Sequence, residues 1–373
     1  MNEDDSRIGL AQQLATQAIG LAEPNPRVGC VLFADDGHEI GRGSTQAVGG
    51  PHAEIVALRD AAARGHSARG ATAYVTLEPC SHHGRTGPCC DALVAAGVRR
   101  VVASIADPNP LVAGQGFARL RAAGVEVVTG PGADESRELN IGFFSRMLRG
   151  TPWVRLKIAA SLDGTTALDN GTSQWITGAA ARADGHAWRA RACAVLTGIG
   201  TVREDNPQLN VRLAPSSRQP RLVVVDSRLE TPLDAALFQP GGRDLVFYAA
   251  VADAGRDAAL RQRGASVTYL PGPTPATHTK VDLRAMLADL AAHEVNELHV
   301  EAGHKLNGSL LREGLVDELL VYLAPKLIGQ GRGMAAFGPL QTLHQSLALH
   351  FHATAMVGDD LRILARVAGR DRF

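Results

Sequence analysis

The sequence lacks an excess of charge of either sign and lacks a long apolar segment. Among its 373 residues, 38 basic side chains balance 38 acidic ones. Proteins that bind nucleic acid or an acidic membrane surface usually carry a basic excess, so charge supports neither class. No apolar run approaches the roughly 18 residues of a transmembrane helix, and the acidic segment 1–7 lacks the apolar core of a secretory signal. We therefore expect no membrane segment and no nucleic-acid partner.

Lysine and cysteine are both scarce. Lysine occurs at only four positions, so arginine carries most of the positive charge, as coding bias alone would produce. The five cysteines are Cys30, Cys80, Cys89, Cys90 and Cys193. An odd, unevenly spaced set argues against a disulfide framework and favours a reducing, cytoplasmic compartment.

The chain is long enough for two domains of about 100–200 residues each. A turn-rich segment at 149–152 is the best linker, which gives domains at 1–148 and 152–373. Hydrophobic periodicity predicts helices at 7–22, 52–64, 90–97, 117–123, 134–148, 178–192, 254–263, 282–293 and 304–313. Strands are predicted at 28–33, 39–43, 73–77, 98–105, 125–128, 153–159, 194–198, 221–225, 244–248, 266–270, 297–301 and 317–323. The alternation predicts an α/β fold in both domains, with α/β/α layers in the first.

The strongest chemical signal is a set of three metal-binding side chains. His52 opens a predicted helix, Cys80 follows a predicted strand, and Cys89 lies at the start of the next helix. One imidazole and two thiolates give Zn²⁺ three protein ligands and leave a fourth position for water, as in catalytic zinc sites. Because all three lie at strand–helix junctions, we expect them to meet at one edge of a sheet.

Glu54 stands two residues after His52 and suits proton transfer better than metal binding. It would take a proton from the attacking water and deliver it to a ring nitrogen and then to the departing amine. Each motif alone has an ordinary explanation, with the histidine as a helix cap and the cysteines as small buried residues. Their order and placement together favour a zinc deaminase. A structural zinc site in a regulatory protein would need a fourth protein ligand.

Several motifs resemble the bifunctional riboflavin-biosynthesis deaminase/reductase family. In the first half they are TLEPCSHHGRTGPC at 76–89, NPRVG at 25–29, GPHAE at 50–54 and DPNP at 107–110. Eight residues separate the two cysteine ligands, whereas cytidine- and tRNA-type deaminases have two. One departure is Gly87, where the family usually has proline. In the second half the motifs are KIAASLDG at 157–164, SQWIT at 173–177, GIGTV at 198–202, DNP at 205–207, VEAG at 300–303, VDEL at 316–319 and APK at 324–326.

The resemblance implies two successive reactions. The first half would deaminate 2,5-diamino-6-(5-phosphoribosylamino)pyrimidin-4(3H)-one with Zn²⁺, giving 5-amino-6-(5-phosphoribosylamino)uracil. The second half would reduce the ribosyl group to a ribityl chain with NADPH. The implied folds are a cytidine-deaminase-like domain and a dihydrofolate-reductase-like domain, and a homodimer or homotetramer is plausible. A deaminase of nucleic-acid bases with an unrelated second domain is the alternative, which neutral charge and the cysteine spacing disfavour.

The resemblance also implies residues for the second site. NADPH would contact Ala159, Trp175, Thr201, Asp205, Ser227, Gly303, His304, Lys305, Leu306, Asn307, Gly308 and Ser309. The substrate would contact Ser173, Arg189, Leu209, Arg212 and Glu301.

The second half can also be read from its residues alone. No G-x-G-x-x-G fingerprint follows a strand, which excludes the usual dinucleotide motif. Gly198 and Gly303 each end a strand where backbone amides suit a phosphate, although ordinary turns have the same glycines. Arg189 and Arg212 could bind the substrate phosphate or lie on the solvated surface. Glu301 and Asp205 could order ribose hydroxyls or relay a proton.

Overall fold

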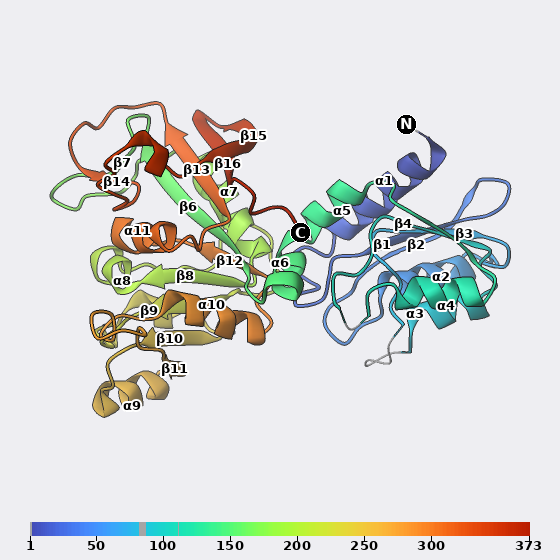
Figure 1. Cartoon of the computed structure of the whole chain (residues 1–373), viewed down its shortest axis with the longest axis horizontal. Helices are drawn as coiled ribbons and strands as arrows, with labels where there is room; N and C mark the ends of the chain where they lie inside the picture. The colour runs from blue at the N-terminus through green and yellow to red at the C-terminus, as the bar shows by residue number, and fades with distance from the viewer. Residues whose placement is uncertain (1, 82–86, 111) are drawn as a thin grey trace. The chain divides into compact units, whose positions relative to one another are not determined.

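The computed structural model describes residues 2–81, 87–110 and 112–373. These residues form two compact units, Met1–Gly150 and Thr151–Phe373. Both units are mixed α/β, as the alternation of apolar periods predicts (Figure 1). No helix in the described ranges is both long enough and apolar enough to cross a membrane.

The first unit contains a five-stranded sheet and helices on both of its faces. Its elements are α1 (Glu3–Thr16), β1 (Gly29–Phe33), β2 (Glu39–Ser44), α2 (Ala53–Ala63), β3 (Thr72–Val75), α3 (Cys89–Ala95), β4 (Arg100–Ala103), α4 (Gln115–Ala122), β5 (Glu126–Thr129), α5 (Ala133–Leu139) and α6 (Ile141–Arg149). The strand order is β2-β1-β3-β4-β5. Strands β3, β4 and β5 are parallel, and β1 is antiparallel to both of its neighbours.

Apolar residues on both faces of this sheet are buried, which produces three layers. On one face, Ala57 of α2, Leu93 of α3 and Leu120 of α4 join a single core cluster with the strands. On the other face, Ile8 and Ala11 of α1 pack against the strands in a second cluster. This is the predicted α/β/α arrangement, and it leaves the ends of the parallel strands open to build a site.

Two predicted helices have different bounds in the structure. The first begins at Glu3 because Asn2 and Asp5 form a capping box, and it ends at Thr16 rather than at residue 22. The predicted helix 134–148 is divided into α5 and α6 at Asn140. The Asn140 side chain accepts from the backbone N–H of Arg27 (2.7 Å) and donates to its carbonyl (3.0 Å). This long-range pairing interrupts the helix.

The second unit is built on a nine-stranded sheet. Its elements are β6 (Trp153–Ser161), β7 (Thr165–Ala167), α7 (Ala179–Arg191), β8 (Ala194–Gly198), α8 (Ile199–Asp205), β9 (Arg221–Val225), η1 (Ala236–Phe238), β10 (Leu245–Ala249), α9 (Ala254–Gln262), β11 (Ala265–Tyr269), α10 (Leu283–Ala292), β12 (Glu297–Val300), α11 (His304–Arg312), β13 (Glu318–Ala324), β14 (Arg332–Gly333), η2 (Leu343–Gln345), β15 (Leu349–Val357) and β16 (Asp360–Val367). The sequence interpretation did not predict β15, β16, α8 or the small β7–β14 pair.

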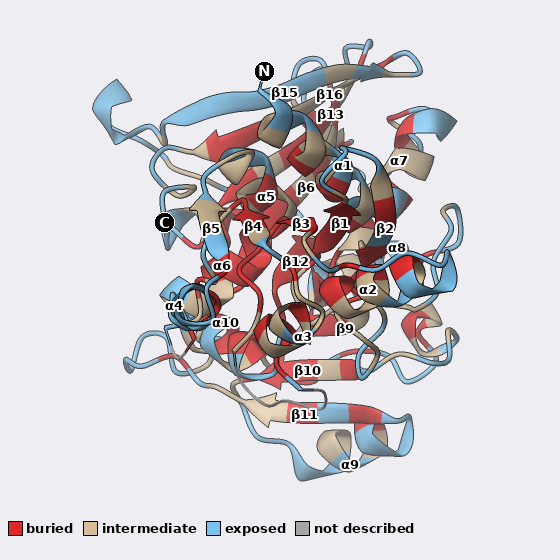
Figure 2. Ribbon diagram, turned by 90° about the vertical axis from the view of Figure 1, so that its right-hand side faces the viewer, coloured by how far each residue is buried: buried red, intermediate tan, exposed pale blue. Residues whose placement is uncertain are grey.

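The strand order of the large sheet is β11-β10-β9-β8-β12-β6-β13-β16-β15. The pairs from β11 through β13 are all parallel, and β16 and β15 continue the sheet as an antiparallel hairpin. The central strands are buried (Figure 2). Parallel strands buried on both faces place their carboxyl ends along one edge, where loops carry the functional side chains.

Candidate active sites

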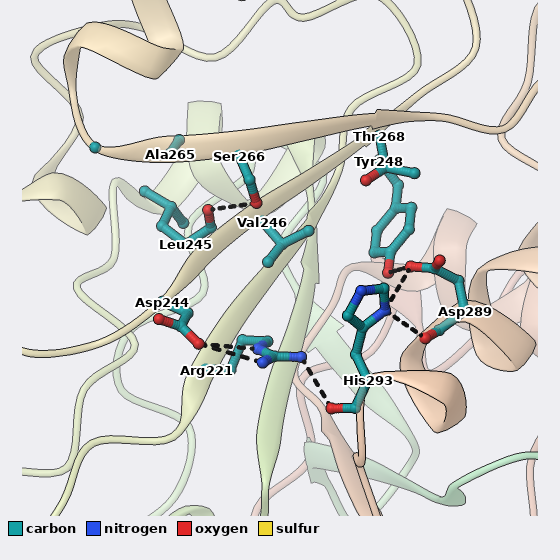
Figure 3. A pocket seen from close by; sticks show the side chains of 11 residues that line it. Arg221, Asp244, Leu245, Val246, Tyr248, Ala265, Ser266, Thr268, Asp289 and His293 are labelled. Atoms are coloured by element: carbon teal, nitrogen blue, oxygen red, sulfur yellow. Dashed lines mark hydrogen bonds and ion pairs between the residues drawn. The ribbon is translucent and has the colours of Figure 1, made fainter.

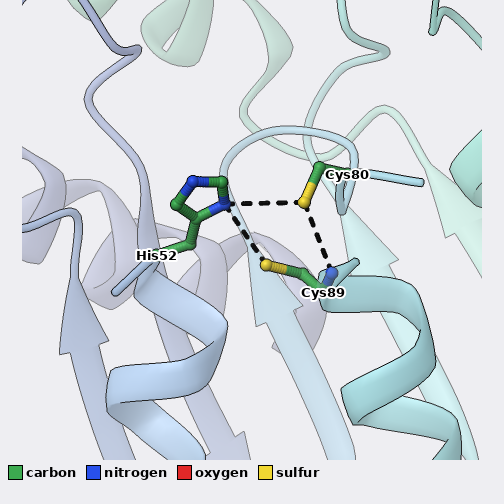
Figure 4. A group of neighbouring side chains, drawn as sticks. All are labelled: His52, Cys80 and Cys89. Carbon is green, nitrogen blue, oxygen red and sulfur yellow. Dashed lines mark hydrogen bonds between the residues drawn. The ribbon is translucent and has the colours of Figure 1, made fainter. Parts of the chain in front are cut away.

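Three metal-binding side chains converge in the first unit (Figure 4). His52 is the N-cap residue of α2, Cys89 is the first residue of α3, and Cys80 lies in the loop after β3. Their ligand atoms lie within 4.8 Å of one another. The sequence prediction that these three residues meet is therefore matched by the structure.

The separations of these atoms fit a tetrahedral zinc ion. The His52 Nδ1 atom lies 3.5 Å from Cys80 Sγ and 3.3 Å from Cys89 Sγ. Zinc bonds of about 2.3 Å to sulfur and about 2.1 Å to nitrogen, at tetrahedral angles, place such atoms about 3.6 Å apart. The donor set is thus suited to Zn²⁺, with Nδ1 as the ligating nitrogen of His52.

The surroundings of the sulfur atoms favour one thiolate before a metal binds. The Cys89 thiol, followed by the His52 imidazole, lowers the pKa of Cys80 to about 4. The Cys89 backbone N–H also donates to Cys80 Sγ at 3.3 Å. The hydrogen bond between the two sulfur atoms raises the pKa of Cys89, and the hydrogen bond between Cys80 and the imidazole raises the pKa of His52. The second thiol therefore loses its proton when a cation compensates the charge.

Glu54 lies in the first turn of α2 beside the metal-binding atoms. Its side chain is buried, with 3% exposed. Burial, reinforced by the charge of Cys80, raises the pKa of Glu54 to about 7. A carboxyl group with this pKa exchanges protons readily near neutral pH, which is the property that a general acid–base needs.

Three further residues near the two cysteine ligands are not assigned to the metal site. Cys90 is adjacent to a ligand but faces away, with its Sγ 3.7 Å from Asp91 Oδ1. Burial raises the pKa of Cys90 to about 11. His82 and His83, which belong to the spacer between the cysteines, lie outside the described residues.

In the second unit, two helices begin directly after neighbouring parallel strands. Gly198 precedes α8 after β8, and Gly303 precedes α11 after β12. Neither glycine provides a side-chain cap, so the first amides of both helices are free of that partner. The Thr197 hydroxyl is buried there and has no partner among the described residues. Two adjacent helix starts with an unsatisfied hydroxyl fit a phosphate-bearing cofactor such as NADPH.

Glu301 is the centre of a charged cluster at the end of β12. Arg189 of α7 donates to its two carboxylate oxygens at 2.7 and 3.0 Å. Lys157 Nζ of β6 lies 3.8 Å from the same carboxylate. Burial raises the pKa of Glu301, but Arg189 and then Lys157 outweigh that effect and lower it overall. Burial lowers the pKa of Lys157.

Two members of this cluster were not assigned a role from the sequence. Lys157 is the first residue of the KIAASLDG motif. A lysine inside a strand, in a chain with only four lysines, is the sequence feature that could have indicated a functional role. His299 is fully buried, neither ring nitrogen has a hydrogen-bond partner in the described chain, and Nε2 lies 3.6 Å from Glu301. Burial lowers the pKa of His299 to about 3, so the ring is neutral. No sequence pattern indicated it.

The predicted substrate and cofactor residues lie on several loops. The Ser173 hydroxyl donates to Asp205 at 3.1 Å. Exposed Arg212 donates from its backbone to His186 Nδ1 at 3.2 Å and from its guanidinium to Asn210 at 2.9 Å.

The other predicted residues are more scattered. Leu209 is buried and has a positive φ of 50°. Trp175 is 63% exposed, with the Arg182 guanidinium 4.6 Å above its ring. The Ser227 hydroxyl, after β9, accepts from Val281 N–H at 3.3 Å.

A separate cavity of about 380 Å³ lies along β10, β11 and α10 (Figure 3). Its charged groups Arg221, Asp244 and Asp289 are already paired. The Tyr248 hydroxyl donates to Asp289 at 2.6 Å, and Arg221 forms an ion pair with Asp244 at 3.2 Å. It contains none of the predicted site residues.

Together, the zinc triad beside a buried glutamate and the α/β unit with paired helix starts define a metal-dependent deaminase joined to a reductase. Comparisons with known proteins agree. Residues 1–105 match the cytidine and deoxycytidylate deaminase zinc-binding region, and residues 152–362 match the RibD C-terminal domain. The chain belongs to the RibD family of bifunctional deaminase/reductases of riboflavin biosynthesis.

Relatives match along nearly the whole chain. Riboflavin biosynthesis protein RibD of Escherichia coli is 44% identical, covering 96% of this chain and 98% of that protein. The Acinetobacter baumannii RibD structure has a TM-score of 0.87 at 39% identity, covering 98% and 99% of the two chains. The diaminohydroxyphosphoribosylaminopyrimidine deaminase/5-amino-6-(5-phosphoribosylamino)uracil reductase of Thermotoga maritima has a TM-score of 0.86 at 29% identity, with the same coverage. These findings disfavour a nucleic-acid base deaminase.

Replacing Cys80 with serine should remove most of the bound zinc, because a hydroxyl is a far weaker zinc ligand than a thiolate. Elemental analysis of the purified protein should give about one zinc per chain for the unmodified protein and a small fraction of that for Cys80→Ser. Cys90→Ser is the matched control and should keep its zinc. Equal zinc contents in the two variants would contradict the assigned ligands.

Proposed function

We propose that residues 1–148 convert 2,5-diamino-6-(5-phosphoribosylamino)pyrimidin-4(3H)-one to 5-amino-6-(5-phosphoribosylamino)uracil, and that residues 152–373 reduce its ribosyl group with NADPH. The main support for the deaminase reaction is the cluster of His52, Cys80 and Cys89 with buried Glu54 beside it. The names of the Thermotoga maritima relative's two activities support this choice of substrates.

In the deaminase unit, Glu54 moves the protons. Zinc bound by His52, Cys80 and Cys89 would supply Lewis acidity that makes a water molecule nucleophilic at neutral pH. Glu54 accepts a proton from the attacking water and delivers it to the ring nitrogen next to the carbon under attack. It then transfers the second proton to the exocyclic amine. The C–N bond breaks, ammonia leaves, and the carbon retains the oxygen.

In the reductase unit, the chain orients the ribosyl group and supplies a proton. When bound, NADPH would supply a hydride to the anomeric carbon. The bond from that carbon to the ring oxygen breaks, and the oxygen must take up one proton to become a hydroxyl. Lys157 is placed for that transfer, since burial lowers its pKa and Glu301 holds its ammonium group. All three nitrogens of the Arg189 guanidinium already have partners, two on Glu301 and one on the carbonyl of Asn210. We therefore assign the substrate phosphate to exposed Arg212.

The cofactor is proposed to lie along the two helix starts after β8 and β12. Thr201 lies in the first turn of α8, and residues 303–306 form the N-cap and first turn of α11. Asp205, at the other end of α8, and residues 307–309, further along α11, remain predicted contacts. An ideal Cβ at Gly303 would lie 3.6 Å from the Thr201 hydroxyl, so the two segments face each other closely. Ala159, Trp175 and Ser227 remain predicted contacts.

Glu54→Gln should retain zinc and lose deamination. Glutamine keeps the size of the side chain but cannot accept a proton, and general acid–base groups contribute about 10²–10⁴-fold to rate. Ammonia release from the diaminopyrimidine ribotide should fall within that range. The reductase reaction, started from the deaminated ribotide, is the internal control and should be unchanged. Normal ammonia release by this variant would refute the role of Glu54.

Arg212→Ala should weaken substrate binding more than cofactor binding in the reductase. Loss of a charge-assisted hydrogen bond to phosphate costs about 1.5–3 kcal/mol, or roughly 10–150-fold in affinity. Steady-state kinetics should show a raised KM for the ribotide, with NADPH binding unaltered. An equal loss of affinity for both ligands would remove this assignment.

We also propose a homo-oligomer formed through β15, and a cytoplasmic location where thiols stay reduced and NADPH is supplied. Among the described residues, strand β15 pairs on one side only, with β16, and it presents Phe351 (73% exposed) and Met356 (65% exposed) to solvent. Exposed apolar edge strands are a recurrent association surface.

Phe351→Asp should lower the molar mass measured by light scattering, because a carboxylate would be buried at the contact. Asp359→Asn, in the turn beside β15, should leave it unchanged. A protein that is monomeric without any substitution would exclude the oligomer.

A further inference from the structure

Glu78 has an unusual environment two residues before the ligand Cys80. Its side chain is 5% exposed. The carboxylate accepts four backbone hydrogen bonds. Oε2 accepts from Asp107 (3.1 Å) and Gly114 (2.9 Å), and Oε1 accepts from Gly116 (2.9 Å) and Phe117 (3.3 Å). These donors belong to a loop and helix about 30–40 residues further along the chain.

These bonds let α4 use a distant carboxylate as its cap. The N-cap residue, Gly114, has no side chain to satisfy the first amides. Glu78 occupies that place and also meets the positive end of the helix dipole. A buried carboxylate is costly unless its oxygens are satisfied, so Glu78 and the start of α4 hold each other in one arrangement.

The same arrangement continues to both cysteine ligands. A Cβ at Gly116 would lie 2.0 Å from the carbonyl oxygen of Pro79, so the main chain before Cys80 lies directly on α4. Arg119, one turn further, donates to the carbonyl of Ser81 (3.1 Å) and pairs with Asp91 (2.7 Å) of the helix that Cys89 opens. Helix α4 is therefore bonded to the segments that carry both thiols.

We propose that Glu78 is a positioning residue for the metal site: its carboxylate fixes the Cys80 segment against α4 and so sets the geometry of the two thiol ligands. A cap supplied from within the Gly114 loop would stabilise α4 equally well but would remove the direct link between the start of α4 and the segment that precedes Cys80. The same bonds fix the loop at Asp107, whose carboxylate accepts from Asn109 N–H at 2.8 Å. The inference rests on the proposed deaminase function, and its test does not depend on activity.

Glu78→Gln is the decisive variant. An amide replaces one acceptor oxygen by a donor, so two of the four N–H groups lose their partner. Residues that orient metal ligands typically contribute about 10–100-fold to metal affinity. Zinc transfer to a coloured chelator should therefore be faster by about that factor. In the cobalt-substituted protein, the visible absorption bands of the thiolate-ligated ion should change in position or intensity.

Asn2→Ala is the matched control, because it removes the cap of α1, a helix of the same unit that packs in a different core cluster from α2, α3 and α4. It should leave zinc transfer and the cobalt spectrum unchanged. Unaltered zinc transfer and spectrum in Glu78→Gln would overturn the proposal, and so would equal effects of the two variants. If Glu78→Gln does not fold, Glu78→Asp decides: it is one methylene shorter, should release zinc faster, and refutes the proposal if it does not.

The outcomes separate this inference from the proposed function. A native protein that releases no ammonia from the ribotide refutes the function, while zinc transfer and the cobalt spectrum still decide the role of Glu78. Reductase activity from the deaminated ribotide should be unchanged in Glu78→Gln, which shows that the second unit is intact.

Discussion

Two sulfur atoms and one imidazole nitrogen lie within 4.8 Å of one another in the first unit, and much of that unit is organised around holding them there. Thiolates at such separations repel each other until a cation binds. His52 and Cys89 are held at the starts of two helices, where backbone amides favour negative charge. Cys80 lies after β3, between Pro79, which lies against Gly116 of α4, and Ser81, whose carbonyl accepts a hydrogen bond from Arg119 of α4. The open sheet edge thus becomes a defined coordination site.

The second unit differs in its electrostatics, because its central acid is neutralised by the protein's own cations and not by a bound metal. Its central group is a single acid, Glu301, surrounded by Arg189 and Lys157. Removing water around unlike charges strengthens their attraction, so these cations keep the buried Glu301 ionised. In both units, residues of the site follow parallel strands: Cys80 comes after β3, and Glu301 comes directly after β12. There, backbone amides and side chains from different segments converge without interrupting the sheet.

The sequence predicted those features that depend on local pattern. Alternating periodicity identified most helices and strands, and residue chemistry with spacing identified His52, Cys80 and Cys89. The break at Asn140 depends on Arg27, 113 residues away, and no local signal reveals it. Strand β15 was missed because most of its residues are exposed and show no inside–outside alternation. The partners of Glu78 and Lys157 are likewise set by tertiary contacts, so both residues stood in motifs without a role.

Burial explains how two different chemistries become possible near neutral pH in one chain. It raises the pKa of Glu54, an acid, and lowers the pKa of Lys157, a base. Both pKa values move toward neutral pH, and a group whose pKa is near the ambient pH exchanges a proton most easily. Glu301 shows that burial alone does not produce this effect, since its cationic partners keep it ionised. The charges next to a buried group therefore decide its role. A group without a close opposite charge can exchange protons, whereas a group paired with cations, as Glu301 is, stays ionised and holds its partners in place.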